Sequence, residues 1–146
     1  MTGPAIPITG DDEADRLLES EPLALLIGML LDQQVPMEWA FRGPATLKDR
    51  LGGLLEAGAI ASMSEDDVVE VCSRKPAIHR FPAAMGRRIH GMCTALADDY
   101  DGDAARLWAD DPSADVLYER LRELPGYGDE KTRIFMAILA KRLGIQ

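Results

Sequence analysis

Cysteine is scarce in this chain of 146 residues. Cys72 and Cys93 stand apart, and neither belongs to a Cys-x-x-Cys pattern. Zinc sites and disulfide frameworks both need several cysteines at short spacings, so neither is expected. No other residue pattern indicates a metal site.

Long apolar runs and a basic N-terminal stretch are also missing. The longest apolar run, Leu23 to Leu31, has nine residues, whereas a membrane-spanning helix needs about 20. The N-terminal region is acidic and lacks the basic stretch that opens a secretory signal. We therefore expect a soluble, cytoplasmic protein with no membrane partner.

Aromatic residues make up only 5% of the chain, although 47% of its residues are hydrophobic. No segment alternates apolar and polar residues over a length typical of a strand. The sequence therefore predicts an all-α fold, and its length suits one helical domain, 1–146, with a sizeable core. Residues 1–10, with two prolines and two glycines, are expected to form an extended start.

Acidic residues outnumber basic ones by 25 to 16, which gives a net charge of −9. Such an excess by itself argues against nucleic-acid binding. The charge is segregated, however. Residues 74–97 contain five basic and no acidic groups, and residues 121–146 contain five basic and three acidic groups. This segregation allows a local DNA footprint on an acidic protein.

Proline, glycine and capping residues divide the chain into about nine or ten expected helices. The segments are 11–18, 23–34, 36–41, 45–51, 54–60, 65–73, 83–100, 103–108, 113–123 and 129–143. Gly43-Pro44 is expected to break the chain between two of them. Segments 23–31 and 134–140 are apolar on every side, so they are expected to be the most buried helices.

A short turn near the C-terminal end, Leu124 to Gly128, joins two of these helices. Pro125 ends the first helix, because the residue before a proline is pushed out of the helical region. Gly126 and Gly128 allow a tight turn and close approach to the main chain. The second helix begins at once, so its unpaired N–H groups and positive dipole end point out of the turn. This geometry indicates either a phosphate site or an ordinary corner between helices.

The pattern Leu-Pro-Gly-x-Gly between two amphipathic helices, residues 113–143, resembles a helix-hairpin-helix. The match is to the base-excision DNA glycosylases, the helix-hairpin-helix–GPD superfamily that includes endonuclease III. Residues 26–34 resemble the family's early helix, which ends in a Leu-Leu-x-x-Gln element. The resemblance implies a helical orthogonal bundle of the six-helix-barrel type. The four-cysteine iron–sulfur loop of many members is absent, so no cofactor is expected.

The resemblance also implies how DNA would be held. The hairpin residues Gly126, Tyr127 and Gly128 would bind a phosphate of duplex DNA without reading its sequence. Gln34 would enter the duplex and fill the space left by an extruded base. The alternative for Gln34 is a polar helix terminus that satisfies its own carbonyl groups.

Basic residues of segment 74–97 are further candidates for DNA contact. Arg87 and Arg88 lie on a helix whose apolar side is expected to face the core. They form either a track for phosphates or a solvated helix face. His79 and His90 have no partner residues nearby in sequence, so neither is expected to be catalytic or to bind a metal.

The hairpin departs from the family at its lysine position. In the bifunctional enzymes the second residue after the last hairpin glycine is the lysine that forms a Schiff base. Glu130 holds that position here, and Lys131 follows one place later, about 100° around the helix. We therefore expect Lys131 to support a phosphate, and we do not expect lyase activity.

The family's catalytic aspartate follows the hairpin by one helix and one loop, but no Asp or Glu follows Glu130 in this sequence. Glycosylase chemistry needs a carboxylate near C1′ of the sugar. Either the family's aspartate lies beyond Gln146, or the protein has none. The catalytic residue is therefore unknown, and the chain as given is expected to bind abasic or mismatched duplexes without releasing a base. Asp32 is the nearest substitute by sequence, although a solvated residue at a helix end is the simpler interpretation.

The sequence thus predicts a DNA-binding protein of the base-excision-repair type, whose partner is damaged or mismatched duplex DNA. If the protein is an enzyme, it is a DNA N-glycosylase. The alternative is a non-catalytic helical protein-interaction module on a glycosylase-like scaffold. The DNA interpretation requires the hairpin glycines, Arg87, Arg88 and Gln34 to share one face.

Overall fold

The computed structural model describes residues 11–143, with side chains described up to residue 140. The expected extended start, residues 1–10, lies outside this part. The described residues form eight α-helices and one 3₁₀ helix, with no strand, which confirms the all-α prediction. The elements are α1 (Asp12–Ser20), α2 (Pro22–Leu31), α3 (Met37–Arg50), α4 (Ala57–Ser62), α5 (Glu65–Ser73), α6 (Pro82–Tyr100), η1 (Ala104–Leu107), α7 (Ala114–Arg122) and α8 (Asp129–Leu143).

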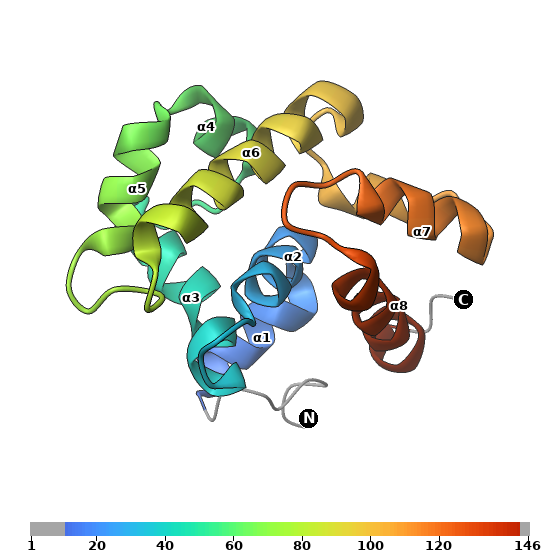
Figure 1. Cartoon of the computed structure of the whole chain (residues 1–146), viewed down its shortest axis with the longest axis horizontal. Helices are drawn as coiled ribbons and strands as arrows, with labels where there is room; N and C mark the ends of the chain where they lie inside the picture. Colours follow the sequence, from blue (N-terminus) through green and yellow to red (C-terminus); the bar gives the residue numbers. More distant parts are fainter. Residues whose placement is uncertain (1–10, 144–146) are drawn as a thin grey trace.

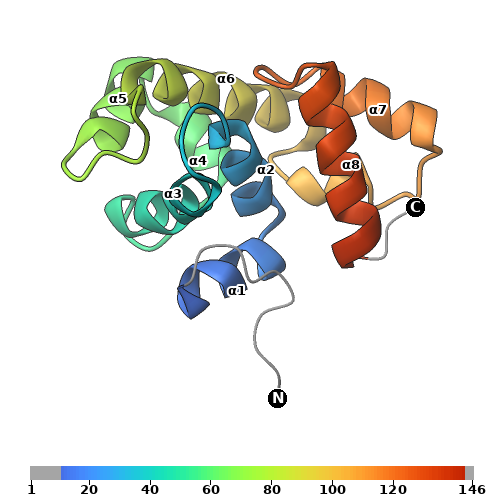
Figure 2. The same cartoon turned by 60° about the horizontal axis from the view of Figure 1, so that its bottom comes forward.

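Helix α2 forms the centre of the molecule. Every residue from Leu23 to Leu31 is buried, as its unbroken apolar sequence predicts. Both views of the fold place it between α3 on one side and α8 on the other (Figures 1 and 2). Long helix α6 packs against α4 and α5 and also contacts α2. Helix α2 therefore contacts both its neighbours in the chain, α1 and α3, and the C-terminal helix α8.

Helix α3 is continuous where the sequence predicted a break at Gly43-Pro44. Both residues are buried. A Cβ atom added to Gly43 would lie 2.5 Å from Cδ1 of Leu31, and one added to Gly28 would lie 2.4 Å from Cδ1 of Phe41. These glycines let α2 and α3 approach closely. The packing gained there outweighs the hydrogen bond that a proline removes from a helix.

Three other segments differ from the sequence expectation. The helix expected at 23–34 ends at Leu31, so Gln33 and Gln34 lie beyond it. The helix expected at 54–60 begins only at Ala57, because Gly52 and Gly53 both have positive φ angles and Glu56 is extended. The helix expected at 103–108 is a 3₁₀ helix, Ala104–Leu107. None of the helices among residues 11–143 is long and apolar enough to cross a membrane.

Helix α8 is less buried than its apolar sequence predicts. Phe135 and Leu139 lie in the core, but the side chain of Ile134 is 46% exposed and Ala137 is exposed. Only one side of the described part of α8 packs against the rest of the fold. The expectation that 134–140 is one of the two most buried helices was therefore wrong.

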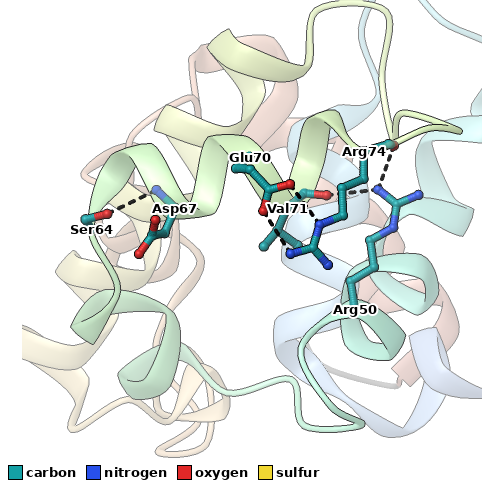
Figure 3. A network of polar contacts seen from close by, with 6 residues as sticks. All are labelled: Arg50, Ser64, Asp67, Glu70, Val71 and Arg74. Atoms are coloured by element: carbon teal, nitrogen blue, oxygen red, sulfur yellow. Dashed lines mark hydrogen bonds and ion pairs between the residues drawn. The ribbon is translucent and has the colours of Figure 1, made fainter.

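Arg50, near the end of α3, organises the segment that follows α5 (Figure 3). Its guanidinium donates to the carbonyl oxygens of Val71 at 2.9 Å, Arg74 at 2.9 Å and Pro76 at 2.6 Å. The last carbonyls of a helix have no partner within the helix, and a cation there also suits the helix dipole. Arg50 thus ends α5 and fixes the path of the chain toward α6.

Candidate nucleic-acid interface

Tyr127 holds the hairpin onto the central helix. Its side chain is buried, and its hydroxyl donates to the carbonyl oxygen of Leu26 at 2.8 Å. Its ring packs edge-on against Phe135 with centroids 5.8 Å apart, and its amide donates to the carbonyl of Leu124. The sequence placed Tyr127 among the DNA-contacting residues. Neither its side chain nor its amide is free for such a contact, so its role is to position its neighbours.

The hairpin leaves a set of amide groups unpaired at the start of α8. The first backbone hydrogen bond there runs from the amide of Thr132 to the carbonyl of Gly128 at 3.0 Å. The amides of residues 128–131 precede that bond and have no acceptor among the described residues. They lie at the positive dipole end of a helix of 15 residues. Such a helix start is suited to an anion.

Residues 128–131 line a groove of about 800 Å³ between the hairpin, the end of α2 and α6. Asp32 and Gln33 line it from the end of α2, and Arg88 lines it from α6. The φ angle of Gly126 is +87°, and a Cβ atom there would lie 3.1 Å from Cδ1 of Leu30. A glycine is therefore required for this turn to pack against α2.

The structure separates the two arginines that the sequence treated together. Arg88 lines the groove, and its guanidinium donates to Oε1 of Gln33 at 3.1 Å. Arg87 points elsewhere and lies 3.8 Å from a carboxylate oxygen of Glu65 on α5, both side chains being more than half exposed. Arg87 is not among the groove residues, because one residue along a helix is a rotation of about 100°.

The two glutamines after α2 also differ. Gln33 is held on both sides, since its side-chain amide donates to the carbonyl of Leu30 at 3.0 Å while its oxygen accepts from Arg88. Gln33 therefore satisfies a carbonyl group at the end of α2, which is the role that the alternative interpretation gave to Gln34. Gln34 is exposed and has a φ angle of +60°, a conformation uncommon for a residue with a side chain. Its side chain has no hydrogen-bond partner in the described part of the chain.

Lys131 reaches across the groove to the end of α2. Its ammonium group donates to the carbonyl oxygens of Met29, Leu30 and Asp32. Burial lowers the pKa of Lys131, an effect that nearby Asp32 opposes and Arg88 reinforces. The sequence placed Lys131 away from the family's lysine position but did not predict that it would cap α2.

Asp32 is the half-buried carboxylate of the same groove. Burial raises its pKa, and the charge of Lys131 partly opposes that effect. Its backbone amide donates to the carbonyl of Met29 at 3.2 Å, but its carboxylate accepts no hydrogen bond from the described residues. Partial burial of a carboxylate without a partner disfavours its charged form relative to a carboxylate in water.

Two further acidic residues, Asp129 and Glu130, begin α8. The Asp129 carboxylate accepts hydrogen bonds from the Tyr118 hydroxyl and from Arg133 at 2.9 Å. The pKa of Asp129 is lowered mainly by the Tyr118 hydrogen bond, and Arg133 lowers it further. Glu130 is exposed, lines the groove, and has no partner among the described residues. Its charge opposes an anion at the hairpin.

His79 connects the start of α6 to the loop after α2, a contact that sequence reasoning missed. The buried His79 ring accepts a hydrogen bond from the Phe81 amide at Nδ1, 2.9 Å, so Nε2 carries the proton and donates to the carbonyl of Gln33 at 2.9 Å. Trp39 stacks on the same ring at 6.4 Å, and the Phe81 side chain is 46% exposed. In the sequence, Phe81 directly precedes the proline that opens α6, and this position could have indicated an aromatic side chain exposed at the start of that helix.

Two of the five basic residues of segment 74–97, Arg74 and Arg87, form ion pairs within the fold. Arg74 forms an ion pair with Glu70 at 2.8 Å, and His90 lies 2.9 Å from the carbonyl of Met63 through Nε2. Lys75 and Arg80 are exposed and form no ion pair with the described residues. Of the residues that the DNA interpretation required on one face, Gly126, Gly128 and Arg88 line the groove together. Arg87 and Gln34 do not line it, so that requirement is not met in full.

These features define an all-helical fold with a C-terminal hairpin on a central buried helix. Comparison with solved structures identifies that fold. A trapped endonuclease III–DNA covalent intermediate, an estranged-adenine complex, matches over 91% of this chain with a TM-score of 0.59 and 17% sequence identity. The chain has an endonuclease III-like helical fold and covers 57% of that chain's length. No protein-family model and no curated protein matches the sequence.

Proposed function

We propose that this chain binds duplex DNA as a base-excision-repair-like protein of the helix-hairpin-helix–GPD type, holding a phosphate at the start of α8. The proposal is supported most directly by residues 128–131, whose amides have no acceptor among the described residues and which line a groove together with Arg88. Backbone amides and a helix dipole bind phosphate without reading base sequence. The likeness of the fold to an endonuclease III that was trapped on DNA adds to this.

Residues around the groove fit a duplex that carries a damaged or mismatched base. Gln34 is exposed on the loop after α2, and the exposed ring of Phe81 is connected to that loop through His79. Neither residue lines the groove, but Gln34 directly follows Gln33, which does. Exposed polar and apolar side chains near a phosphate site can enter a gap in the base stack. Intact duplex resists such entry more than a mismatched or abasic one does.

A second candidate function is protein interaction without DNA, on the same scaffold. The net charge of −9 favours it, as does the solvent-facing Glu130 at the hairpin. A protein-interaction module would not need unpaired amides at residues that line a groove with Arg88. The two functions are separated by binding to duplex DNA and by the effect of salt on that binding.

Fluorescence anisotropy with a labelled abasic duplex tests the proposal. We expect log Kd to rise linearly with log salt concentration, because each phosphate contact releases condensed counterions. A salt-independent Kd, or no binding at low salt, would contradict DNA binding through phosphates.

Substitution of Gly128 tests the hairpin itself. A Cβ atom at Gly128 meets nothing within 4 Å, and the φ angle of Gly128 is not positive, so Gly128→Ala is expected to fold normally. Its methyl group would obstruct the approach of a phosphate to the amides. Gly58→Ala is the matched control, since its Cβ is equally unobstructed and lies on α4, away from the groove. Equal affinities for the two variants would reassign the hairpin to a structural corner.

A further inference from the structure

Five arginines in the described part of the chain form ion pairs, and each partner is a carboxylate. They are Arg74, Arg87, Arg106, Arg120 and Arg133. A carboxylate that holds a guanidinium also opposes its charge, so such a pair has little to offer an anion. Two arginines are held differently, by a neutral side chain. Arg88 donates to Oε1 of Gln33 at 3.1 Å, and Arg122 donates to the hydroxyl oxygen of Tyr118 at 2.9 Å.

Both of these arginines line the groove at the hairpin. Arg88 belongs to α6, Arg122 belongs to the last turn of α7, and the unpaired amides of residues 128–131 belong to the start of α8. Each guanidinium forms one side-chain hydrogen bond, so most of its N–H groups lack a partner in the described part of the chain. A guanidinium that is oriented but keeps its charge and its donors is suited to a phosphate.

Tyr118 holds Arg122 in two ways. The Tyr118 hydroxyl accepts the hydrogen bond from Arg122 and donates its own proton to the carboxylate of Asp129. The guanidinium of Arg122 also lies over the Tyr118 ring, 5.8 Å from its centroid. Asp129 is paired in turn with Arg133 at 2.9 Å. The hydroxyl of Tyr118 therefore separates Arg122 from the carboxylate, and Arg122 itself forms no ion pair with the described residues.

The acidic residues of the groove do not cancel these charges. Those that line it are Asp32, Asp129 and Glu130. Asp129 is opposed by its own arginine, and the positive charge of Lys131 acts on Asp32. Only Glu130 then remains against the two arginines and the positive end of the α8 dipole.

We propose that the groove takes two neighbouring phosphates of one DNA strand, with Arg88 and Arg122 as their side-chain donors. Gln33 and Tyr118 are then the positioning residues of the two arginines. A phosphodiester has only two unesterified oxygens, so the amides of residues 128–131 and two guanidiniums together exceed what one phosphate can accept. The inference rests on the proposed function and extends it from one phosphate at the start of α8 to a stretch of backbone.

Substitution of Arg122 tests the second donor, in anisotropy titrations of the full chain with a labelled abasic duplex. Arg122→Gln should raise Kd about tenfold at low salt and reduce the slope of log Kd against log salt concentration by about 1. Arg16→Gln is the matched control, since Arg16 is exposed on α1, lies outside the groove and forms no ion pair with the described residues. It removes the same net charge. An Arg122→Gln variant with the Kd and slope of Arg16→Gln would overturn the proposal.

Tyr118→Phe tests the positioning role, because it keeps the ring and removes only the hydroxyl. We expect Kd to rise about threefold although no charge is removed. The same change in an Arg122→Gln background should have no further effect, because the hydroxyl acts through that arginine. Urea unfolding of each variant checks that α7 and the hairpin remain folded. Equal losses in the two backgrounds would contradict the assignment of Tyr118.

Duplexes in which a neutral methylphosphonate replaces one phosphate at a time locate the contacts. Two neighbouring positions on one strand should weaken binding to the unmodified chain, and one of them should lose its effect in Arg122→Gln. If a single position matters, or if the two positions lie on different strands, this inference fails and DNA binding at the hairpin stands. If the unmodified chain binds no duplex at low salt, the proposed function fails, and this inference fails with it.

Discussion

Glu130 is the residue most at odds with a phosphate at the hairpin. It begins α8 beside unpaired amides, it lines the groove, and no described residue neutralises it. Asp129, its neighbour, differs because Tyr118 and Arg133 hold its carboxylate. The two acids therefore have separable effects, although they are adjacent in the sequence.

Removing the charge of Glu130 should strengthen DNA binding. Glu130→Gln keeps the size of the side chain and removes one repulsion from the groove, so we expect a Kd several-fold lower at low salt, with the difference shrinking as salt screens it. Anisotropy titrations at two salt concentrations measure this. Glu119→Gln, an exposed acid on α7 outside the groove, is the control. A Kd unchanged by Glu130→Gln would mean that phosphate does not approach the start of α8.

Gln33 and Gln34 show what the sequence could and could not predict at this scale. Their position after an apolar helix predicted that one glutamine would face the ligand. In the structure Gln33 lines the groove, held by a hydrogen bond from Arg88, 55 residues later, whereas Gln34 does not line it. No local pattern contains that contact. The same holds for Lys131, since the helix rotation that takes it to the end of α2 is set by Tyr127 and Phe135 in the core.

Helices α2 and α8 differ in burial, and stability should follow the difference. Leu26 is fully buried, so Leu26→Ala is expected to lower the free energy of unfolding by ~2–5 kcal/mol. Ile138 is only partly buried against the core, and Ile138→Ala should cost about 1 kcal/mol. Urea unfolding of both variants measures the two losses. An equal loss at both sites would mean that α8 is packed more deeply than the structure shows.

Element boundaries were predictable where local chemistry decides them. Ser64 caps α5 by accepting from the amide of Asp67, and Pro82 opens α6, as the sequence indicated. The break expected in α3 was wrong because two close helix contacts, at Gly28 and Gly43, outweigh the local effect of a proline. The exposure of α8 was missed for a related reason. An all-apolar helix predicts burial, but the number of neighbours around it is a property of the whole fold.

The stability of the whole molecule should depend on pH through His79. Burial lowers the pKa of His79 in the folded state below its usual 6.5, and two nearby arginines, Arg80 and Arg88, add to this despite the opposing carbonyl contacts. The unfolded chain therefore binds a proton more readily. Stability is fully present above the unfolded pKa and is lost as pH falls below it. Protonation would also break the hydrogen bond that Nδ1 accepts from Phe81.

Urea unfolding from pH 7.5 to pH 5.5 should accordingly show a falling free energy of unfolding toward acid. In His79→Gln, whose side-chain amide can still donate to the carbonyl of Gln33, this dependence should be weaker. The depressed carboxyl pKa values of Glu70, Asp110 and Asp129 act at lower pH, so they do not produce the slope in this window. Identical slopes in both proteins would assign the dependence to another group.

The three hydrogen bonds of Arg50 should protect the chain from proteolysis. Residues 74–81 have no regular secondary structure, and Arg74 and Arg80 within them are exposed cleavage sites for trypsin. A protease can cut such a segment only after its backbone unfolds locally. Arg50 prevents that by tying the segment to α3. Arg50→Met should therefore turn a resistant loop into the first point of digestion, giving two fragments that divide the molecule just before α6.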